Sequence, residues 1–226
     1  MSRKSPSVRT GKKRLRVLLV DDHPMVRERL AEIINREADL VVSGEAEDRQ
    51  GAIKAILAHP PDLAIIDLKL KNSDGLELIK DIKTRWSKLR MLVVSMHDES
   101  LYAERVIHAG ALGYITKQEA TRRILEAIRT VLAGKVYVSA KVAGHLVSKL
   151  VSHGGHDSTN PAEALADREL QVFELIGDGH NMQGIARQLH IATKTVETYR
   201  ARIKEKLNLK NGSDLLQLAI SWSRKQ

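Results

Sequence analysis

Between residues 15 and 133, short apolar runs alternate with longer segments in which apolar residues recur every three or four positions. A short apolar run between polar residues predicts a buried strand, and the wider spacing predicts an amphipathic helix. The strands are predicted at 15–20, 40–45, 63–66, 89–94 and 111–115. A helix is predicted after each strand, at 24–36, 50–58, 75–85, 101–109 and 119–132. Strict alternation predicts a doubly wound α/β domain with a five-stranded parallel sheet.

The pattern changes beyond this first domain. Residues 139–151 predict a short amphipathic helix, and 152–161 combine turn-forming residues with no large apolar side chain, which is typical of a linker. No strand pattern follows, and helices are predicted at 167–178, 181–189, 193–208 and 212–222. The predicted organisation is a basic tail over 1–14, the α/β domain over 15–133, a connecting segment with a short helix over 134–161 and a small all-α domain over 162–226.

The composition of the chain excludes several kinds of site and several cellular locations. The chain has no cysteine, which excludes disulfides, thiol catalysis and cysteine-based zinc sites. Its apolar runs are far shorter than the ~18 residues that a membrane span needs. The basic N-terminus is not followed by the apolar segment of a secretory signal. We therefore expect a cytoplasmic protein without membrane contact.

Positive charge is concentrated at the N-terminus. The net charge is +9, and residues 1–16 contain seven basic and no acidic residues. Such a segment can be an arm that contacts nucleic acid or a solvated tail, and the sequence leaves both interpretations open.

Polar residues follow four of the five predicted strands. Asp21 and Asp22 follow the first strand, Asp67 the third, Ser95 the fourth and Lys117 the fifth. Because the carboxyl ends of parallel strands meet at one edge of the sheet, we expect these side chains to converge there. A divalent cation together with one ammonium group would balance three carboxylates, and oxygen ligands favour Mg²⁺ over zinc. Taken alone, Asp21 or Asp22 could instead cap the first helix.

The motifs of the first domain resemble the flavodoxin-like receiver domain of two-component response regulators. They are VDDHP, the single aspartate in IIDLKLKNSDG, Ser95 and the string YITK. The resemblance covers about residues 15–133 and implies that Asp67 accepts a phosphoryl group from a histidine kinase. It implies a magnesium site formed by Asp21, Asp22, Asp67 and the backbone carbonyl of Lys69. It further implies that Ser95 and Lys117 contact the phosphoryl group and that Tyr114 changes rotamer on activation.

Two features bear on how closely the domain follows this pattern. Gln118 stands where many receivers have proline, so we expect a trans peptide bond before it. Lys69 and His97 each lie two positions beyond a site residue. We expect this cationic pair to flank the attacking water and slow the loss of the phosphoryl group.

Residues 181–208 predict two helices joined by a tight turn, the second with a polar outer face. This is a helix-turn-helix pattern, whose second helix can enter a major groove of DNA. The string from ADRELQVFELIGDGHNMQGIARQL to TVETYRARIKEKLNLKNGSDLLQLA resembles the LuxR-type DNA-binding domain of the NarL/FixJ class, over about 162–224. The resemblance implies base contacts from Lys194, Glu197, Thr198, Ala201 and Arg202, and phosphate contacts from Lys194, Thr195, Arg187 and Arg200.

The sequence also predicts which residues cap the N-termini of two helices in this domain. Ala166 stands where the class usually has a capping threonine, so we expect Asp167 to become the N-cap of the helix at 167–178. We expect Thr193 to cap the helix at 193–208.

Together the two halves predict a transcription regulator whose phosphorylation controls dimerisation and sequence-specific DNA binding. Its partners would be a histidine kinase or small phosphodonor, double-stranded DNA and a second copy of the chain. Its only catalysis would be its own phosphorylation and dephosphorylation. In this class the unphosphorylated receiver often covers the reading helix, and whether it does so here is a hypothesis that the sequence leaves open. Two alternatives are a Mg²⁺-dependent aspartyl phosphatase, which Lys69 in place of a second aspartate disfavours, and a module that binds protein.

Overall fold

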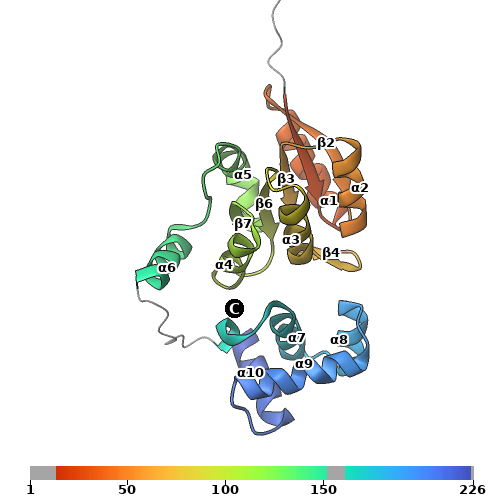
Figure 1. Ribbon diagram of the computed structural model, residues 1–226, viewed down its shortest axis with the longest axis vertical. Coiled ribbons are helices and arrows are strands. Elements are labelled where there is room, and N and C mark those ends of the chain that lie inside the picture. The colour runs from red at the N-terminus through yellow and green to blue at the C-terminus, as the bar shows by residue number, and fades with distance from the viewer. Residues whose placement is uncertain (1–13, 152–160, 225–226) are drawn as a thin grey trace, which may run out of the picture.

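The computed structural model describes residues 14–151 and 161–224, which form an α/β domain and a smaller helical domain (Figure 1). The predicted basic tail, apart from Arg14, lies outside the described residues, as does most of the predicted linker. No helix within the described ranges is long and apolar enough to cross a bilayer.

The α/β domain is built on a five-stranded parallel sheet. Its strands in chain order are β1 (Leu15–Val20), β2 (Leu40–Ala46), β3 (Leu63–Ile66), β6 (Arg90–Ser95) and β7 (Gly113–Thr116). They lie in the order β2-β1-β3-β6-β7, and every neighbouring pair is parallel. The predicted doubly wound fold is confirmed, because β1 lies inside the sheet and successive crossovers leave it in both directions.

Helices cover both faces of this sheet. They are α1 (Pro24–Asn35), α2 (Arg49–Ala58), α3 (Gly75–Arg85), α4 (Glu99–Ala109) and α5 (Lys117–Leu132). Alternate residues of β1 point to opposite faces, as the pleat requires. Val17 and Leu19 pack with α1 and α5, whereas Leu18 and Val20 pack in the core that α2, α3 and α4 cover.

A small hairpin between β3 and α3 is absent from the sequence prediction. Its strands, β4 (Lys69–Leu70) and β5 (Ser73–Asp74), contain two residues each, too few to give a periodic pattern. Gly75 closes the hairpin, and its N–H donates to the Leu68 carbonyl at 2.9 Å. A Cβ at this position would overlap the Asp67 carbonyl oxygen and lie 2.7 Å from the Leu68 Cα, so only glycine fits beside this loop.

Helix α6 (Ala140–Val151) belongs to the α/β domain by its contacts, since it packs against α4. Val142 is buried there, and the Ser139 N–H donates to the Glu99 carboxylate at 2.7 Å. The connection to the helical domain therefore starts after α6, later than the predicted boundary at residue 133.

The helical domain consists of η1 (Pro161–Ala164), α7 (Asp167–Gly177), α8 (Met182–Leu189), α9 (Thr193–Lys206) and α10 (Gly212–Ser223). Its core is centred on Phe173 of α7 and Trp222 of α10, whose ring centroids are 5.4 Å apart. Val196 and Ile203, on the inner face of α9, are fully buried.

Two predicted helix caps are wrong. The N-cap of α7 is Ala166, and Asp167 is the first helical residue. Ala166 has no capping oxygen, but its N–H donates to the Glu169 carboxylate at 2.8 Å, which retains half of a capping box. The N-cap of α9 is likewise one residue earlier than expected, at Ala192, with Thr193 as the first helical residue.

Candidate functional site

The carboxyl edge of the sheet brings together three of the predicted site residues in a buried cluster. Asp21 and Asp67 are 4% and 3% exposed, where ionised carboxylates need a partner. Lys117, the first residue of α5, supplies it, because its Nζ lies 2.7 Å from Asp21 Oδ2 and 2.7 Å from Asp67 Oδ2. One ammonium group thus bridges two carboxylates from different strands.

Asp22 lies at the rim of this cluster with His23, which the sequence analysis did not single out. The His23 Nδ1 is 2.7 Å from Asp22 Oδ1 and 3.1 Å from Asp21 Oδ1. The N-cap of α1 is His23 rather than either aspartate, so the capping alternative is wrong. The position of His23 directly after the two aspartates was the one signal for it in the sequence.

At the centre of the site, burial and neighbouring charges shift the pKa values of the side chains in opposite directions. Burial raises the pKa of Asp67 above its ordinary value, the Lys117 ammonium lowers it, and the neighbouring Asp21 adds to the rise. Burial alone would lower the pKa of Lys117, but its hydrogen bonds to the two carboxylates raise it. A single ammonium therefore compensates the acidic cluster only in part.

The remaining oxygen atoms suit a divalent cation. Asp21, Asp22, His23 and Asp67 each offer a ligand atom, and these atoms lie within 4.8 Å of one another. Asp67 Oδ1 is buried and accepts no hydrogen bond from any residue in the described ranges. A buried, unpartnered carboxylate oxygen beside further carboxylates fits a hard cation such as Mg²⁺. Lys69 begins β4 two residues after Asp67, and ligation by its carbonyl stays a prediction.

Ser95 and Tyr114 lie on the neighbouring strands β6 and β7, two positions apart in register, and both are fully buried. The Ser95 Oγ accepts a long hydrogen bond, 3.4 Å, from the His97 N–H. The Tyr114 hydroxyl donates to the His97 carbonyl at 2.7 Å, and burial raises the pKa of this tyrosine. The two predicted switch residues thus hold the backbone of the same loop residue.

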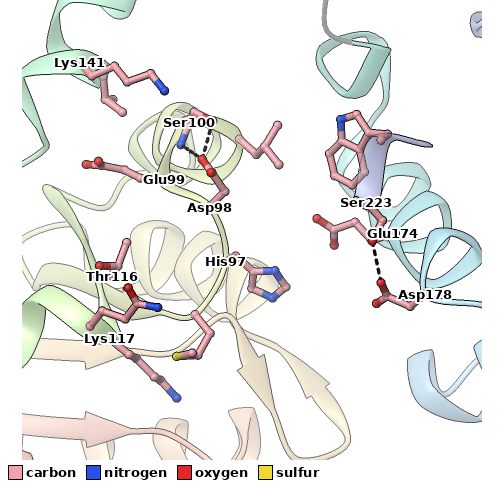
Figure 2. Close-up of a pocket in the computed structure, with 15 residues that line it drawn as sticks. His97, Asp98, Glu99, Ser100, Thr116, Lys117, Lys141, Glu174, Asp178 and Ser223 are labelled. Atoms are coloured by element: carbon pink, nitrogen blue, oxygen red, sulfur yellow. Dashed lines mark hydrogen bonds between the residues drawn. The ribbon is translucent and has the colours of Figure 1, made fainter. Parts of the chain in front are cut away.

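The side chain of His97 faces away from the position expected for it. Its ring packs against Tyr102 of α4, with 4.7 Å between ring centroids. Figure 2 shows His97 on the side of its loop that faces the helical domain. Burial lowers the pKa of His97, which favours the neutral ring. Its expected role beside an attacking water has no support in this geometry.

The predicted DNA-reading residues share the outer face of α9. Five side chains are exposed there: Lys194, Glu197, Thr198, Ala201 and Arg202. Of the predicted phosphate contacts, Arg187 on α8 is exposed, and Thr195 and Arg200 are partly buried. Lys194 and Glu197 form an exposed ion pair at 2.9 Å.

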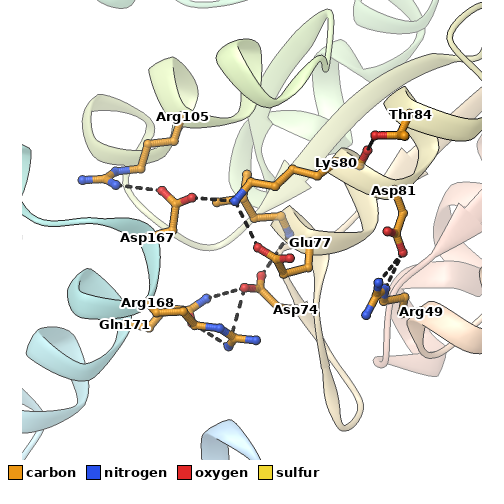
Figure 3. A network of polar contacts seen from close by, with 11 residues as sticks. Arg49, Asp74, Glu77, Lys80, Asp81, Thr84, Arg105, Asp167, Arg168 and Gln171 are labelled. Atoms are coloured by element: carbon orange, nitrogen blue, oxygen red, sulfur yellow. Dashed lines mark hydrogen bonds and ion pairs between the residues drawn. The ribbon is translucent and has the colours of Figure 1, made fainter. Parts of the chain in front are cut away.

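The α/β domain contacts α7 rather than the outer face of α9. Asp167, at the first turn of α7, pairs with Arg105 of α4 and with Lys80 of α3 (Figure 3). One turn later, the Gln171 amide donates to the buried carboxylate of Asp74 at 3.0 Å. The hypothesis that the receiver covers the reading helix finds no support in the contacts of the described residues. Sequence reasoning missed this interface because its partners lie tens of residues apart and share no motif.

An acidic pocket bridged by lysine at the edge of a parallel sheet, joined to a helix-turn-helix, defines a receiver domain that controls a DNA-binding domain. Family models match both parts: the response regulator receiver domain matches residues 17–129, and the luxR family of bacterial regulatory proteins matches residues 163–219. The chain belongs to the response regulators of the NarL/FixJ type, which are transcription regulators rather than enzymes.

Known relatives match over almost the whole length. The chain is 34% identical to the oxygen regulatory protein NreC of Staphylococcus haemolyticus, over 91% of this chain and 97% of the relative. It is 34% identical to the response regulator GacA of Pseudomonas aeruginosa, over 91% and 95%. RcsB from Salmonella enterica serovar Typhimurium, solved bound to a promoter with a phosphomimetic, is 25% identical, with a TM-score of 0.66 over 92% of this chain and 100% of that chain.

Proposed function

We propose that Asp67 accepts a phosphoryl group from the phosphohistidine of a sensor kinase, or from a small phosphodonor. The resulting phosphoprotein dimerises and binds paired DNA sites through α9. The observation that carries the proposal is the position of Asp67, with one oxygen on Lys117 at 2.7 Å and the other buried without a hydrogen bond.

The residues around Asp67 fit an in-line phosphoryl transfer. The Asp67 carboxylate forms the new P–O bond while the bond between phosphorus and the donor breaks. A Mg²⁺ ion held by Asp21, Asp22 and Asp67, with the Lys69 carbonyl, would neutralise charge on the phosphoryl oxygens. Lys117 then pairs with one phosphoryl oxygen, and the Ser95 hydroxyl, fully buried nearby, donates to another.

The second half of the proposal concerns DNA. The exposed outer face of α9 offers side chains that suit base edges, since a guanidinium can fork onto guanine and a carboxylate can accept from cytosine. We expect Arg202 and Glu197 to take these roles. A solved relative, RcsB, is described as two dimers bound to two parallel DNAs, which supports dimeric binding.

The phosphorylation step is tested by intact mass after incubation with acetyl phosphate. The wild type should gain one phosphoryl group in the presence of Mg²⁺ and none with a chelator. Asp67→Asn, which keeps the size of the side chain, should gain nothing, and Asp62→Asn serves as the matched control. Modification of Asp67→Asn equal to that of the wild type would show that another residue is the acceptor.

DNA binding is tested by selecting sequences from a random duplex library with phosphorylated protein. Recovery of one motif as a pair of half-sites, bound with a steep dependence on salt, is the expected result. Enrichment of no motif, with Asp67 fully phosphorylated, would favour a helical domain that binds protein.

A further inference from the structure

Two carboxylates of α7 contact the α/β domain in different ways. They are seven positions apart and so lie on the same side of the helix. Asp167 is 2.8 Å from the Arg105 guanidinium and 2.9 Å from the Lys80 ammonium. Glu174 instead accepts a hydrogen bond from the Tyr102 hydroxyl at 2.7 Å, and it forms no ion pair with any residue of the described ranges.

The surroundings of Glu174 supply little positive charge. Arg105, the nearest cation on α4, is already engaged by Asp167 and by the carbonyls of Ala162 and Leu165. Asp178 lies one turn further along α7, and both acids line a cavity of about 600 Å³ between the domains (Figure 2). The two pockets that Glu174 lines also contain ionisable groups from the neighbouring elements: His97 and Asp98 before α4, Glu99 and Tyr102 on α4, Lys117 on α5, Lys141 on α6, Arg49 on α2, Lys69 on β4, Asp74 on β5, Glu77 on α3, Arg168 on α7 and His190 after α8. Among the cations, Arg49 pairs with Asp81, Arg168 with Asp74, and Lys117 with Asp21 and Asp67.

These environments set opposite protonation states. Although burial favours the neutral acid at Asp167, the hydrogen bonds from Lys80 and Arg105 hold its pKa below the ordinary value. Burial raises the pKa of Glu174 to about 7, the Tyr102 hydroxyl opposes the rise, and Asp178 adds to it. One contact of the interface is therefore permanently ionic, whereas the other changes charge near neutral pH.

We propose that Glu174 is a proton-dependent latch between the two domains, closed on Tyr102 when the carboxyl is protonated and weakened when it ionises. An ionised Glu174 would still accept from Tyr102. However, one hydroxyl does not replace the water that a carboxylate loses at this interface, and Asp178 repels the added charge.

The direction of the pH effect follows from the raised pKa. The Glu174 carboxyl binds its proton more tightly when the domains are docked than when they are apart. Docking is therefore strongest in acid and weakens as pH rises through about 7. With an ordinary value of 4.5 for the undocked carboxyl, the docking constant should fall about tenfold between pH 6 and pH 8. His97 acts in the opposite direction: burial lowers its pKa in the docked arrangement, so protonation of the ring in acid opposes the part of that burial that docking supplies.

The latch also connects to the phosphorylation site, if Asp67 is the acceptor as proposed above. Tyr102 packs on the His97 ring, and the His97 backbone is bonded to Ser95 and Tyr114. A phosphoryl group offers a charged acceptor to the hydroxyl proton of Ser95, whose oxygen accepts the long bond from the His97 N–H. The proton and the phosphoryl group therefore act on one loop from opposite ends, and any coupling between them is reciprocal.

The test measures docking directly in the full-length, unphosphorylated protein. Because the chain has no cysteine, cysteines placed at the exposed positions Lys54 and Gln217 accept spin labels selectively. Pulsed dipolar spectroscopy at pH 6, 7 and 8 then gives the fraction of molecules with the docked inter-domain distance. In the wild type this fraction should fall with rising pH, corresponding to a docking constant about tenfold lower at pH 8.

Glu174→Gln is the decisive variant, because an amide keeps the acceptor for Tyr102 but cannot ionise. Its docked fraction should not fall between pH 6 and 8, whereas Glu205→Gln, on the exposed face of α9, should titrate like the wild type. Tyr102→Phe keeps the ring on His97 and should lower the docked fraction at every pH. A wild type without pH dependence, or a Glu174→Gln variant that titrates like it, would overturn the proposal.

This measurement stands apart from the phosphorylation test. It uses protein without phosphodonor, so failure of Asp67 to accept a phosphoryl group would leave the docking result unchanged. Conversely, phosphorylation of Asp67 with pH-independent docking would reject the latch alone.

Discussion

The acidic pocket of the receiver domain and the reading face of α9 are built on opposite principles. At the pocket, two buried carboxylates and one lysine hold each other within 2.7 Å before any ligand arrives. On α9, the five predicted base-reading side chains are exposed, and Lys194 and Glu197 satisfy each other at the surface. The pocket is organised in advance, whereas we expect the outer face of α9 to acquire its arrangement on binding DNA.

Because of this difference, a single substitution should affect folding stability differently in the two regions. Removing the single ammonium of the pocket leaves two buried carboxylates without their partner, which costs several kcal/mol. Removing one charge from the reading face leaves its neighbours in water, where the folded protein loses little. Substitutions in the pocket should therefore change both stability and chemistry, and those on α9 should change DNA binding alone.

The largest effect is expected from Lys117→Met, which leaves Asp21 and Asp67 without their ammonium. Unfolding in urea should show a loss of about 3 kcal/mol, and intact mass should show little phosphorylation. Adding Asp21→Asn should restore part of the stability by removing one of the two unpaired negative charges. Lys54→Met, at an exposed position, is the matched control. Equal stability of Lys117→Met and the control would mean that the pocket tolerates unpaired carboxylates.

A second test changes a glycine that packs against the backbone of the pocket. Gly75→Ala places a methyl group against the Asp67 carbonyl and the Leu68 Cα, so the loop that carries Asp67 must shift. We expect a loss of about 1–3 kcal/mol in thermal or urea unfolding, together with slower phosphorylation. Gly144→Ala, in α6 with open space around it, should not be destabilising. Unchanged phosphorylation in Gly75→Ala would show that the exact path of this loop is unimportant.

On the reading face, Arg202→Ala should act on DNA only. Loss of a guanidinium that reads a base should cost about 1–3 kcal/mol of binding and relax the preference at one position of the site. Fluorescence anisotropy with the selected duplex and single-base variants measures both. Arg29→Ala removes the same charge from the exposed surface of α1 and should leave specificity intact. A uniform loss over all variant duplexes would reassign Arg202 to the phosphate backbone.

The smallest effect is expected from Lys194→Ala. A lost phosphate contact should weaken binding to all sequences alike and lower the slope of log affinity against log salt by about 1. The urea unfolding curve should stay unchanged, because the Lys194 pair with Glu197 is exposed. A change in base preference with an unchanged salt slope would mean that Lys194 reads a base.

The fold was largely predictable because its strands are short apolar runs that leave a clear pattern. Arg90–Ser95 and Leu63–Ile66 lie within one residue of their predicted bounds. The β4–β5 hairpin was not predictable, since two-residue strands have no period. The convergence of Asp21, Asp67 and Lys117 followed from the parallel sheet alone, and the structure brings them together as expected.

What the sequence could not supply was the interface between the domains. Asp167 was assigned to a helix cap from local pattern, but its carboxylate pairs with Lys80 and Arg105 of the receiver domain. His97 was expected to flank the attacking water because of its spacing from Ser95, whereas its ring packs on Tyr102. In both cases a rule based on sequence spacing was applied to a side chain whose contacts are made by another element of the structure.

The anchoring of α6 on the receiver domain has a consequence for the energetics of the whole chain. Because the Ser139 N–H is bonded to Glu99 and Val142 is buried against the receiver, the two domains are separated in sequence only by the residues between α6 and η1. Two domains so close along one chain meet at an effective concentration of about a millimolar or more. Surfaces with an intrinsic dissociation constant near that value are then half associated within one molecule. Such a balance lets a single proton, or a single phosphoryl group, decide between two arrangements of the domains.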